Sequence, residues 1–431
     1  MKKILFVLAL LASMQVADAQ VKSANAAKAA VESAKAAVDN VKKNTKSTTW
    51  IKYGQALMDA YNSPAGNIWQ GMTDQDLQLV GEKATSEEQT TVNGQPMVKK
   101  IYSNKNLYFD QNGKLAVIEV TKPVVDGALD KALEAYKQAA KIDNGSKNKD
   151  IADGIKAICD KYNEEAVNAY TFGKFAEAAT LFNKTFETSQ VAPLSQLDTA
   201  AIYNAGLVSV MGGDYAKGKE YFEKSVKYGY YGEDGEAYAK LGEVYDKLGD
   251  KAASKAIFEE GFSKFPQSQG ILIGLINYYI NSGEDTGRLF KLLDDAKKNE
   301  PGNASLYYVE GNIHSKLGNE EAAIAAWDKC AEINPAYEFG FIGKGLYFYN
   351  KAADLQKAAS EESDDAKYMK MMEDFEKYLK GCVEPIEKAF EITKDDETKA
   401  SLATYLKSVC FILRNDPEYQ AKYDKYAPLA Q

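Results

Sequence analysis

The sequence predicts an all-α fold in which about seven helical hairpins stack into a solenoid, a right-handed superhelix, with a small β-hairpin insert near the N-terminus. Two regularly spaced series of turn-forming residues lead to this prediction. Prolines recur at gaps of 35 and 34 residues, at Pro266, Pro301 and Pro335. Glycines recur at gaps of 40, 36, 34 and 35 residues, at Gly173, Gly213, Gly249, Gly283 and Gly318. A nearly constant period in the thirties is typical of stacked repeats.

The N-terminus has the pattern of a cleaved signal peptide over residues 1–19. Lys2 and Lys3 precede an apolar run from Ile4 to Leu11, and Ala17-Asp18-Ala19 supplies a cleavage site. The run is shorter than the roughly 20 residues that a membrane-spanning helix needs, and no later stretch is apolar enough to span a membrane. A buried N-terminal helix is the alternative. We therefore expect an exported protein, periplasmic or associated with the outer membrane, with secretion left open.

Residues 20–46 predict an N-terminal capping helix. Between Ala24 and Val41, small and apolar side chains step by three and four residues, which gives a narrow apolar stripe on a helix. We expect this stripe to pack on the first repeat, and a free coiled coil is the alternative.

The first repeat, 47–143, is predicted to be split. Residues 47–61 have the pattern of its first helix and 127–143 that of its second. The insert between them, 62–126, contains β-rich segments and a turn at Gln111-Asn112-Gly113. We expect two or three strands, at Lys99–Tyr102, Leu107–Asp110 and Lys114–Val120. The insert would either shield the end of the array or act as a docking surface.

A regular array is predicted over 150–337. Its clearest copy runs from Gly235 to Ser268, where Gly242 lets two helices approach closely and Pro266 ends the second helix. The copy from Ala304 to Tyr337 has the same residue types at matching positions. Aromatic, glycine and proline positions of the two copies are Tyr238, Gly242, Phe258 and Pro266, and Tyr307, Gly311, Trp327 and Pro335.

The last repeat, 338–393, is predicted to be split by an acidic stretch around 358–366. Residues 394–431 then provide a C-terminal capping helix and tail, because an array must close its apolar end.

The copy at Gly235–Ser268 resembles the tetratricopeptide repeat, whose signature is an aromatic residue, Leu-Gly, Tyr, a distal Phe and a closing Pro. The chain as a whole resembles a family of exported tetratricopeptide proteins of Bacteroidales. The passages that carry this resemblance are Trp50–Tyr61, Ile271–Tyr279 and Ala304–Asn312. The resemblance implies an envelope address in a Gram-negative cell and implies no reaction.

Composition and motifs argue against catalysis and against nucleic acid as a partner. The formal net charge is −9, and only two arginines occur, Arg288 and Arg414, so the chain is a poor phosphate binder. The single histidine, His314, is expected to be packed or hydrogen-bonded inside a repeat, and most catalytic or metal sites would have to use it. We expect no enzyme activity, no cofactor and no metal. Four cysteines stand far apart, and a Cys382–Cys410 disulfide is left open.

Stacked first helices are expected to line a concave groove, and we predict that a protein or peptide partner binds there. Tyrosine offers large contact area with a polar tip, and asparagine can hydrogen-bond an extended backbone. The candidate groove residues are Tyr203, Asn204, Lys240, Glu243, Asn277, Tyr308, Asn312, Lys316, Phe339 and Tyr349. The leading hypothesis is thus a non-enzymatic exported scaffold. The alternative is a structural or assembly factor at the outer membrane that acts through its end caps and the insert.

Overall fold

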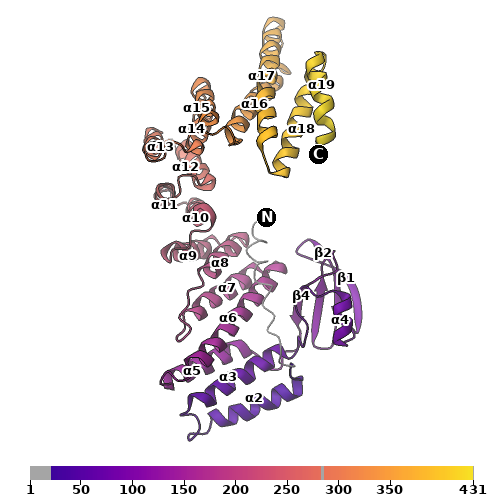
Figure 1. The fold of residues 1–431 in the computed structure, drawn as a ribbon, viewed down its shortest axis with the longest axis vertical. Coiled ribbons are helices and arrows are strands. Elements are labelled where there is room, and N and C mark those ends of the chain that lie inside the picture. The colour runs from indigo at the N-terminus through magenta and orange to yellow at the C-terminus, as the bar shows by residue number, and fades with distance from the viewer. Residues whose placement is uncertain (1–20, 283–285, 431) are drawn as a thin grey trace. The chain divides into compact units, whose positions relative to one another are not determined.

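The computed structural model describes residues 21–282 and 286–430 (Figure 1). It is mostly helical with one small antiparallel sheet near the N-terminus, which confirms the predicted fold class. The predicted signal peptide and Gly283 lie outside the described residues. Within the described part, no helix has the length and apolar character to cross a membrane. The chain divides into two compact units, one of residues up to Gly232 with Val244–Asp250, the other of Glu233–Glu243 with Lys251–Gln431.

The first unit is built from helical hairpins whose partner helices lie side by side. They are formed by α3 with α5, α6 with α7, and α8 with α9, and α2 packs on α3 (Figure 1). In α2, Ala27 and Val38 are buried. The bounds are α2 Ala24–Val38, α3 Ser47–Asn62, α5 Ala128–Ile142, α6 Asn148–Thr171, α7 Phe175–Ser189, α8 Thr199–Met211 and α9 Tyr215–Lys227.

The insert forms four strands rather than two or three, in the order β1-β2-β3-β4 with every pair antiparallel. The additional strand is β1, Ser86–Val92, whose outward positions are polar and exposed. A turn at Asn93-Gly94, both at positive φ, joins it to β2. The other elements are the short helix α4, Asp74–Val80, and the strands β2 Gln95–Ile101, β3 Lys105–Phe109 and β4 Leu115–Val120.

The sheet has two buried faces. One face packs with α4, where Leu77, Leu107 and Leu115 share a core. On the other face, Tyr108 meets Phe172 at the end of α6, with ring centroids 5.1 Å apart in an edge-to-face arrangement. The insert is therefore held against the α6–α7 turn by an aromatic contact.

The second unit continues the hairpin pattern and ends in long helices. One helix, α10, Glu236–Lys247, has residues in both units. The acidic stretch is short, because α16 extends to Ala359 and α17 begins at Asp365, capped by the Asp364 side chain. The remaining bounds are α11 Lys251–Lys264, α12 Gln269–Ser282, α13 Gly287–Asn299, α14 Ala304–Lys316, α15 Glu320–Ile333, α16 Phe339–Ala359, α17 Asp365–Ile392, α18 Asp396–Leu413 and α19 Pro417–Tyr426.

In three of the described hairpins an aromatic side chain lies between two glycines. Phe258 of α11 lies against Gly242 of α10 and also against Gly274 of the next first helix, α12. A Cβ added at Gly242 or at Gly274 would lie 2.4 or 2.2 Å from the Phe258 ring. Neither helix could carry a side chain there without displacing the ring, since carbon atoms in contact lie roughly 3.5–4.0 Å apart.

The same arrangement holds Trp327 of α15. A Cβ at Gly311 would lie 2.5 Å from the indole Nε1, and a Cβ at Gly343 would lie 2.6 Å from the same atom. In the first repeat the ring is Tyr136 and the glycines are Gly54 and Gly154. The aromatic ring thus joins its own first helix to the first helix of the following repeat.

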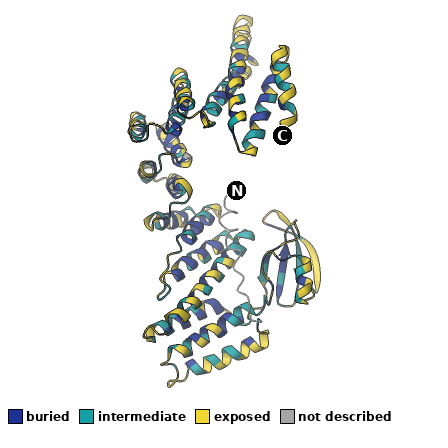
Figure 2. Ribbon diagram, viewed as in Figure 1, coloured by how far each residue is buried: buried dark blue, intermediate teal, exposed yellow. Residues whose placement is uncertain are grey.

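The C-terminal helices share one core. Residues of α17, α18 and α19 meet in it, and buried segments of α17 and α18 are dark blue in Figure 2. The core includes Leu379, Ile386, Leu406 and Tyr426, all at most 2% exposed. Cys382 and Cys410 belong to this core and are free thiols. The second C-terminal helix, α19, was not expected. It starts with Asp416 as N-cap and Pro417 in its first turn.

Candidate functional site

Several of the expected groove residues remain accessible on the first helices of the second unit. We call this set the first-helix surface; it comprises Ile273, Asn277, Tyr308, Asn312, Lys316 and Phe339. Asn277 and Lys316 are exposed, Ile273 is 55% exposed and Phe339 37% exposed, while Tyr308 and Asn312 are half-buried. Ile273 is the most exposed large apolar side chain of the set.

Equivalent positions of successive repeats produce this surface. Asn277 of α12 and Asn312 of α14 each follow the position of the helix-contact glycine. Ile273 and Tyr308 lie four residues before them, hence on the same helix face. Consecutive first helices α12 and α14, and α14 and α16, are in contact. The surface therefore presents an apolar row beside an amide row.

The apolar row continues into an aromatic cluster at the start of α16. The Phe339 ring lies 5.7 Å from that of Tyr308 and 5.2 Å from that of Tyr337. Beside it, the Asn312 amide oxygen accepts a hydrogen bond of 3.2 Å from Trp327 Nε1. Tyr308 and Asn312 are thus held by the packing of their own repeat, whereas the free part of Phe339 faces solvent.

On α10, the candidates Lys240 and Glu243 form an ion pair of 3.0 Å with each other, one helical turn apart. A partner that bound either charge would have to compete with this pair. We therefore expect Lys240 and Glu243 to contribute less to partner binding than the candidates whose side chains are not paired with each other.

The prediction that Tyr203 and Asn204 of α8 line the groove is wrong. They are 3% and 7% exposed, and the Tyr203 ring packs at 5.6 Å from Phe222 and 5.3 Å from Tyr230. Helix α8 is apolar around most of its circumference, so both of its faces are buried and helical periodicity could not identify an exposed one. These two residues belong to the core.

Tyr349 of α16 is half-buried. Its ring meets Tyr405 of α18 edge-to-face at 5.0 Å, and it packs on the C-terminal core. The C-terminal helices therefore occupy the part of α16 where the groove was expected to continue.

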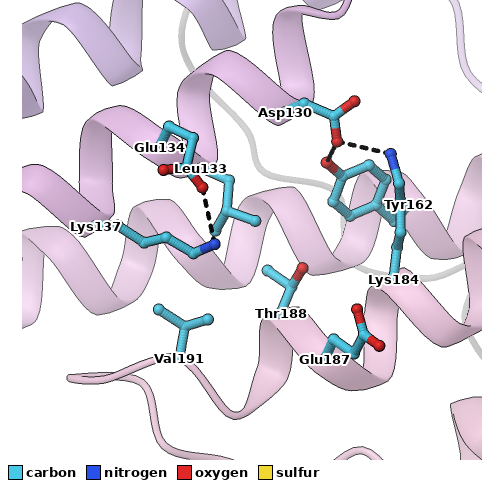
Figure 3. A pocket seen from close by; sticks show the side chains of 9 residues that line it. All are labelled: Asp130, Leu133, Glu134, Lys137, Tyr162, Lys184, Glu187, Thr188 and Val191. Atoms are coloured by element: carbon cyan, nitrogen blue, oxygen red, sulfur yellow. Dashed lines mark hydrogen bonds and ion pairs between the residues drawn. The ribbon is translucent and has the colours of Figure 1, made fainter.

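A pocket of about 240 Å³ lies in the first unit, and no sequence pattern predicted it. It opens between the second helices α5 and α7, with Tyr162 of α6 at one side (Figure 3). Its lining residues are Asp130, Leu133, Glu134, Lys137, Tyr162, Lys184, Glu187, Thr188 and Val191. No periodic pattern could reveal it, because the two helices come from different repeats and are separated by α6.

Asp130 organises one side of the pocket. Its Oδ1 accepts hydrogen bonds from the Tyr162 hydroxyl at 2.5 Å and from Lys184 Nζ at 2.7 Å. Burial alone would raise the pKa of the Asp130 carboxyl, but these two hydrogen bonds outweigh it and the pKa lies below its ordinary value. Lys184 also lies over the Tyr162 ring, 5.1 Å from its centroid. Asp130 is therefore an anion, and its charge is already balanced.

His314 is half-buried and packed, as expected. Its ring lies 4.7 Å from that of Phe290, and its Nδ1 is 3.4 Å from the Asn319 amide nitrogen. Among the described residues, no group of three or more histidine, cysteine or acidic side chains is placed to hold a metal ion. The Cys330 thiol is fully buried, and burial raises its pKa to about 11.

Comparison with known proteins agrees with this architecture. The tetratricopeptide repeat family matches residues 235–263 and 304–337, which correspond to the hairpins α10–α11 and α14–α15. A TPR repeat-containing protein of Methanocaldococcus jannaschii is 22% identical over 245 residues. The aligned region is 52% of this chain and 39% of that protein, so the chain spans well under half of this relative.

Two solved structures are tetratricopeptide repeat proteins of related kinds. One, from Parabacteroides merdae, has a TM-score of 0.35 and 11% identity, over 63% of this chain and 93% of that one. The other, from Bacteroides fragilis, has a TM-score of 0.25 and 17% identity, over 63% and 98%. The family match therefore identifies two tetratricopeptide repeats in this chain, and the observed helical hairpins agree with it.

Proposed function

We propose that this protein is an exported, non-enzymatic scaffold that binds a protein or peptide partner through the first-helix surface. Tetratricopeptide repeats typically mediate binding to proteins or peptides. The observation that carries the assignment to this surface is the exposed Ile273, which lies four residues before Asn277 on the same face of α12.

The chemistry of the surface favours an extended peptide segment. Exposed apolar and aromatic side chains provide contact area for alternate side chains of such a segment. Asn277 has two amide donors and a carbonyl acceptor, which suits a peptide backbone that has both groups. Phe339 is held by two aromatic neighbours, so little side-chain entropy is lost when it is covered.

Site-specific photo-crosslinking tests this proposal. A photoreactive amino acid replaces Lys316 on the first-helix surface, and a second variant carries it at Tyr368, an exposed position of α17. In cells, we expect a discrete adduct from position 316 that mass spectrometry identifies. The adduct should disappear when Ile273→Ala and Phe339→Ala are combined. An adduct that survives this double substitution, or that forms equally at position 368, would contradict the assignment.

The export step has its own test. The signal pattern over residues 1–19 supports cleavage before Gln20. Purification from the source cells and N-terminal sequencing should give Gln20 as the first residue, and deletion of residues 2–19 should leave the protein in the cytoplasm. A mature chain that still begins at Met1 would refute export by this route.

The alternative function, an assembly factor that acts through the insert, is favoured by one observation. Strand β1 forms the edge of the sheet, and its outward positions from Ser86 to Gln89 are exposed. Replacing residues 63–125 by a short linker separates the two functions. Loss of the partner on this deletion would favour the insert, and retention would favour the first-helix surface.

A further inference from the structure

We infer that the pocket between α5 and α7 binds the cationic side chain of a partner protein, a lysine or an arginine. This is a second site. The first-helix surface lies on first helices of the second unit, whereas the pocket lies between two second helices of the first unit. The inference concerns a different part of the molecule and can hold or fail by itself.

The size of the pocket suits a side chain. Its volume of about 240 Å³ is below the roughly 300–1,000 Å³ typical of sites for cofactors and drug-sized molecules. Leu133 from α5 and Val191 after α7 give it an apolar portion (Figure 3). Lysine and arginine both carry an aliphatic stem that packs on such surface while the charged head reaches polar groups.

The hydroxyl of an otherwise buried threonine is directed into this space. Thr188 is 2% exposed and lines the pocket, and its hydroxyl points towards the gap between α5 and α7 in Figure 3. In the described part of the chain no hydrogen bond to this hydroxyl is found. The hydroxyl oxygen can therefore accept a hydrogen bond from a donor that enters the pocket.

The pocket is lined by more carboxylates than ammonium groups. Lys184 is bound to Asp130 at 2.7 Å, and Lys137 is bound to Glu134 at 2.9 Å. Glu187 is exposed and accepts a hydrogen bond from the neutral Asn183 amide at 2.8 Å, and within the described ranges it forms no ion pair. Three carboxylates thus face two ammonium groups.

This balance selects a cation over an anion. An anion would have to displace Asp130 or Glu134 from its lysine, and it would enter beside Glu187. A cation finds Glu187 available and the Thr188 hydroxyl as acceptor. The whole chain has a formal net charge of −9, which also favours approach of a basic partner.

Nuclear magnetic resonance of methyl groups tests the inference on the full chain from residue 20. The probe is Nα-acetyl-arginine amide, and its neutral control is the citrulline analogue, which has nearly the same shape. We expect saturable shifts of the Leu133 and Val191 methyl signals in the millimolar range with the arginine probe. The citrulline probe should bind about ten-fold more weakly, because it lacks the charge-assisted interaction.

Two variants locate the contact. Glu187→Gln should weaken binding of the arginine probe about five-fold, as expected for one partly exposed ion pair. Thr188→Val, which keeps the shape, should weaken it as well. The matched control is Glu164→Gln on α6, an exposed carboxylate outside the pocket, and it should leave binding unchanged.

Several results would overturn the inference. They are equal binding of arginine and citrulline probes, stronger binding of acetate than of arginine, and the absence of saturable shifts at Leu133 and Val191. Loss of photo-crosslinking at position 316 with intact arginine binding would refute only the first-helix surface. The converse result would refute only this pocket.

Discussion

A glycine-to-alanine substitution should have opposite effects at two helical positions of the second unit. At Gly311 the added Cβ would lie 2.5 Å from Trp327 Nε1. The indole has little room to retreat, because Gly343 is also close: a Cβ added there would lie 2.6 Å from the same atom. At Gly381 in α17 the nearest atom to the added Cβ would be Phe348 Cδ2 at 3.4 Å, an ordinary contact. The two positions therefore separate steric cost from helix propensity.

The magnitudes follow from two terms. Alanine in place of glycine in a helix interior stabilises by about 1 kcal/mol. Overpacking a filled core costs about 1–3 kcal/mol, and at Gly311 the upper end applies because the ring is confined on both sides. The net effect is a loss of about 2 kcal/mol for Gly311→Ala and a gain of about 1 kcal/mol for Gly381→Ala.

Thermal unfolding followed by circular dichroism is the assay. For a unit of this size, we expect Gly311→Ala to lower its transition by about 4–8 °C and Gly381→Ala to raise it by about 2–4 °C. Repeat arrays can unfold in parts, so amide hydrogen exchange of α14 and α15 should locate the loss at the repeat that contains Gly311.

A second substitution tests the cause. Phenylalanine at position 327 lacks the five-membered ring of the indole, which contains Nε1. In a Trp327→Phe background, Gly311→Ala should therefore lower the free energy of unfolding by less than it does beside tryptophan. A coupling of at least about 0.5 kcal/mol is expected between the two sites. The reasoning is refuted if Gly311→Ala and Gly381→Ala shift the transition in the same direction.

Three further predictions follow from buried polar groups. Lys105→Ala should destabilise the insert by about 2 kcal/mol in hydrogen exchange, since the Lys105 side chain is 2% exposed and bridges Glu82 at 2.5 Å and the Pro64 carbonyl at 2.9 Å. Burial raises the pKa of the Glu165 carboxyl, so its ionised form destabilises the fold at neutral pH and this penalty disappears as pH falls through the raised pKa. Urea unfolding at pH 7 should therefore give Glu165→Gln a higher free energy of unfolding than wild type. This difference in free energy should shrink as the pH falls from 7 through the raised pKa of Glu165 towards the ordinary pKa of a glutamate. All four thiols should resist alkylation in the folded protein, and all four should react once it unfolds without reductant; uptake of only two labels would instead indicate a Cys382–Cys410 disulfide.

The helices could be predicted closely where glycine, proline and capping residues mark their ends. The second helix of the first repeat, expected over 127–143, is observed at Ala128–Ile142. By contrast, α17 starts at Asp365, inside the acidic stretch predicted around 358–366, because its first two turns are exposed and carry no apolar period. Local signals for the missed elements were present in Asn93-Gly94 before β2 and in Asp416-Pro417 before α19.

The binding surfaces were harder to predict, for a physical reason. Periodicity separates a buried face from an exposed one only when a helix has both, and α8 is covered on both sides, which placed Tyr203 in the core. The cover over Tyr349 comes from α18, more than one repeat later in the chain. The pocket at Thr188 depends on how far apart two second helices lie, a distance that no local pattern encodes.

The first repeat shows that an insertion can leave a hairpin intact. Tyr136 of α5 approaches Gly54 of α3 and Gly154 of α6 as closely as Trp327 approaches its own two glycines, although residues 62–126 separate α3 from α5. The hairpin is thus complete without the insert, and a long surface insertion costs little loop-closure entropy.

Replacing residues 63–125 by a short linker should therefore leave the first unit folded. The deletion removes the Tyr108 contact with Phe172 and the 2.7 Å hydrogen bond from Gln70 to Asn168, so Phe172→Ser belongs in the same variant to avoid a new apolar patch. We expect the hydrogen-exchange protection of α3, α5 and α6 to persist. Loss of protection throughout these helices would show that the insert is part of the core, and the deletion could then no longer distinguish the two proposed functions.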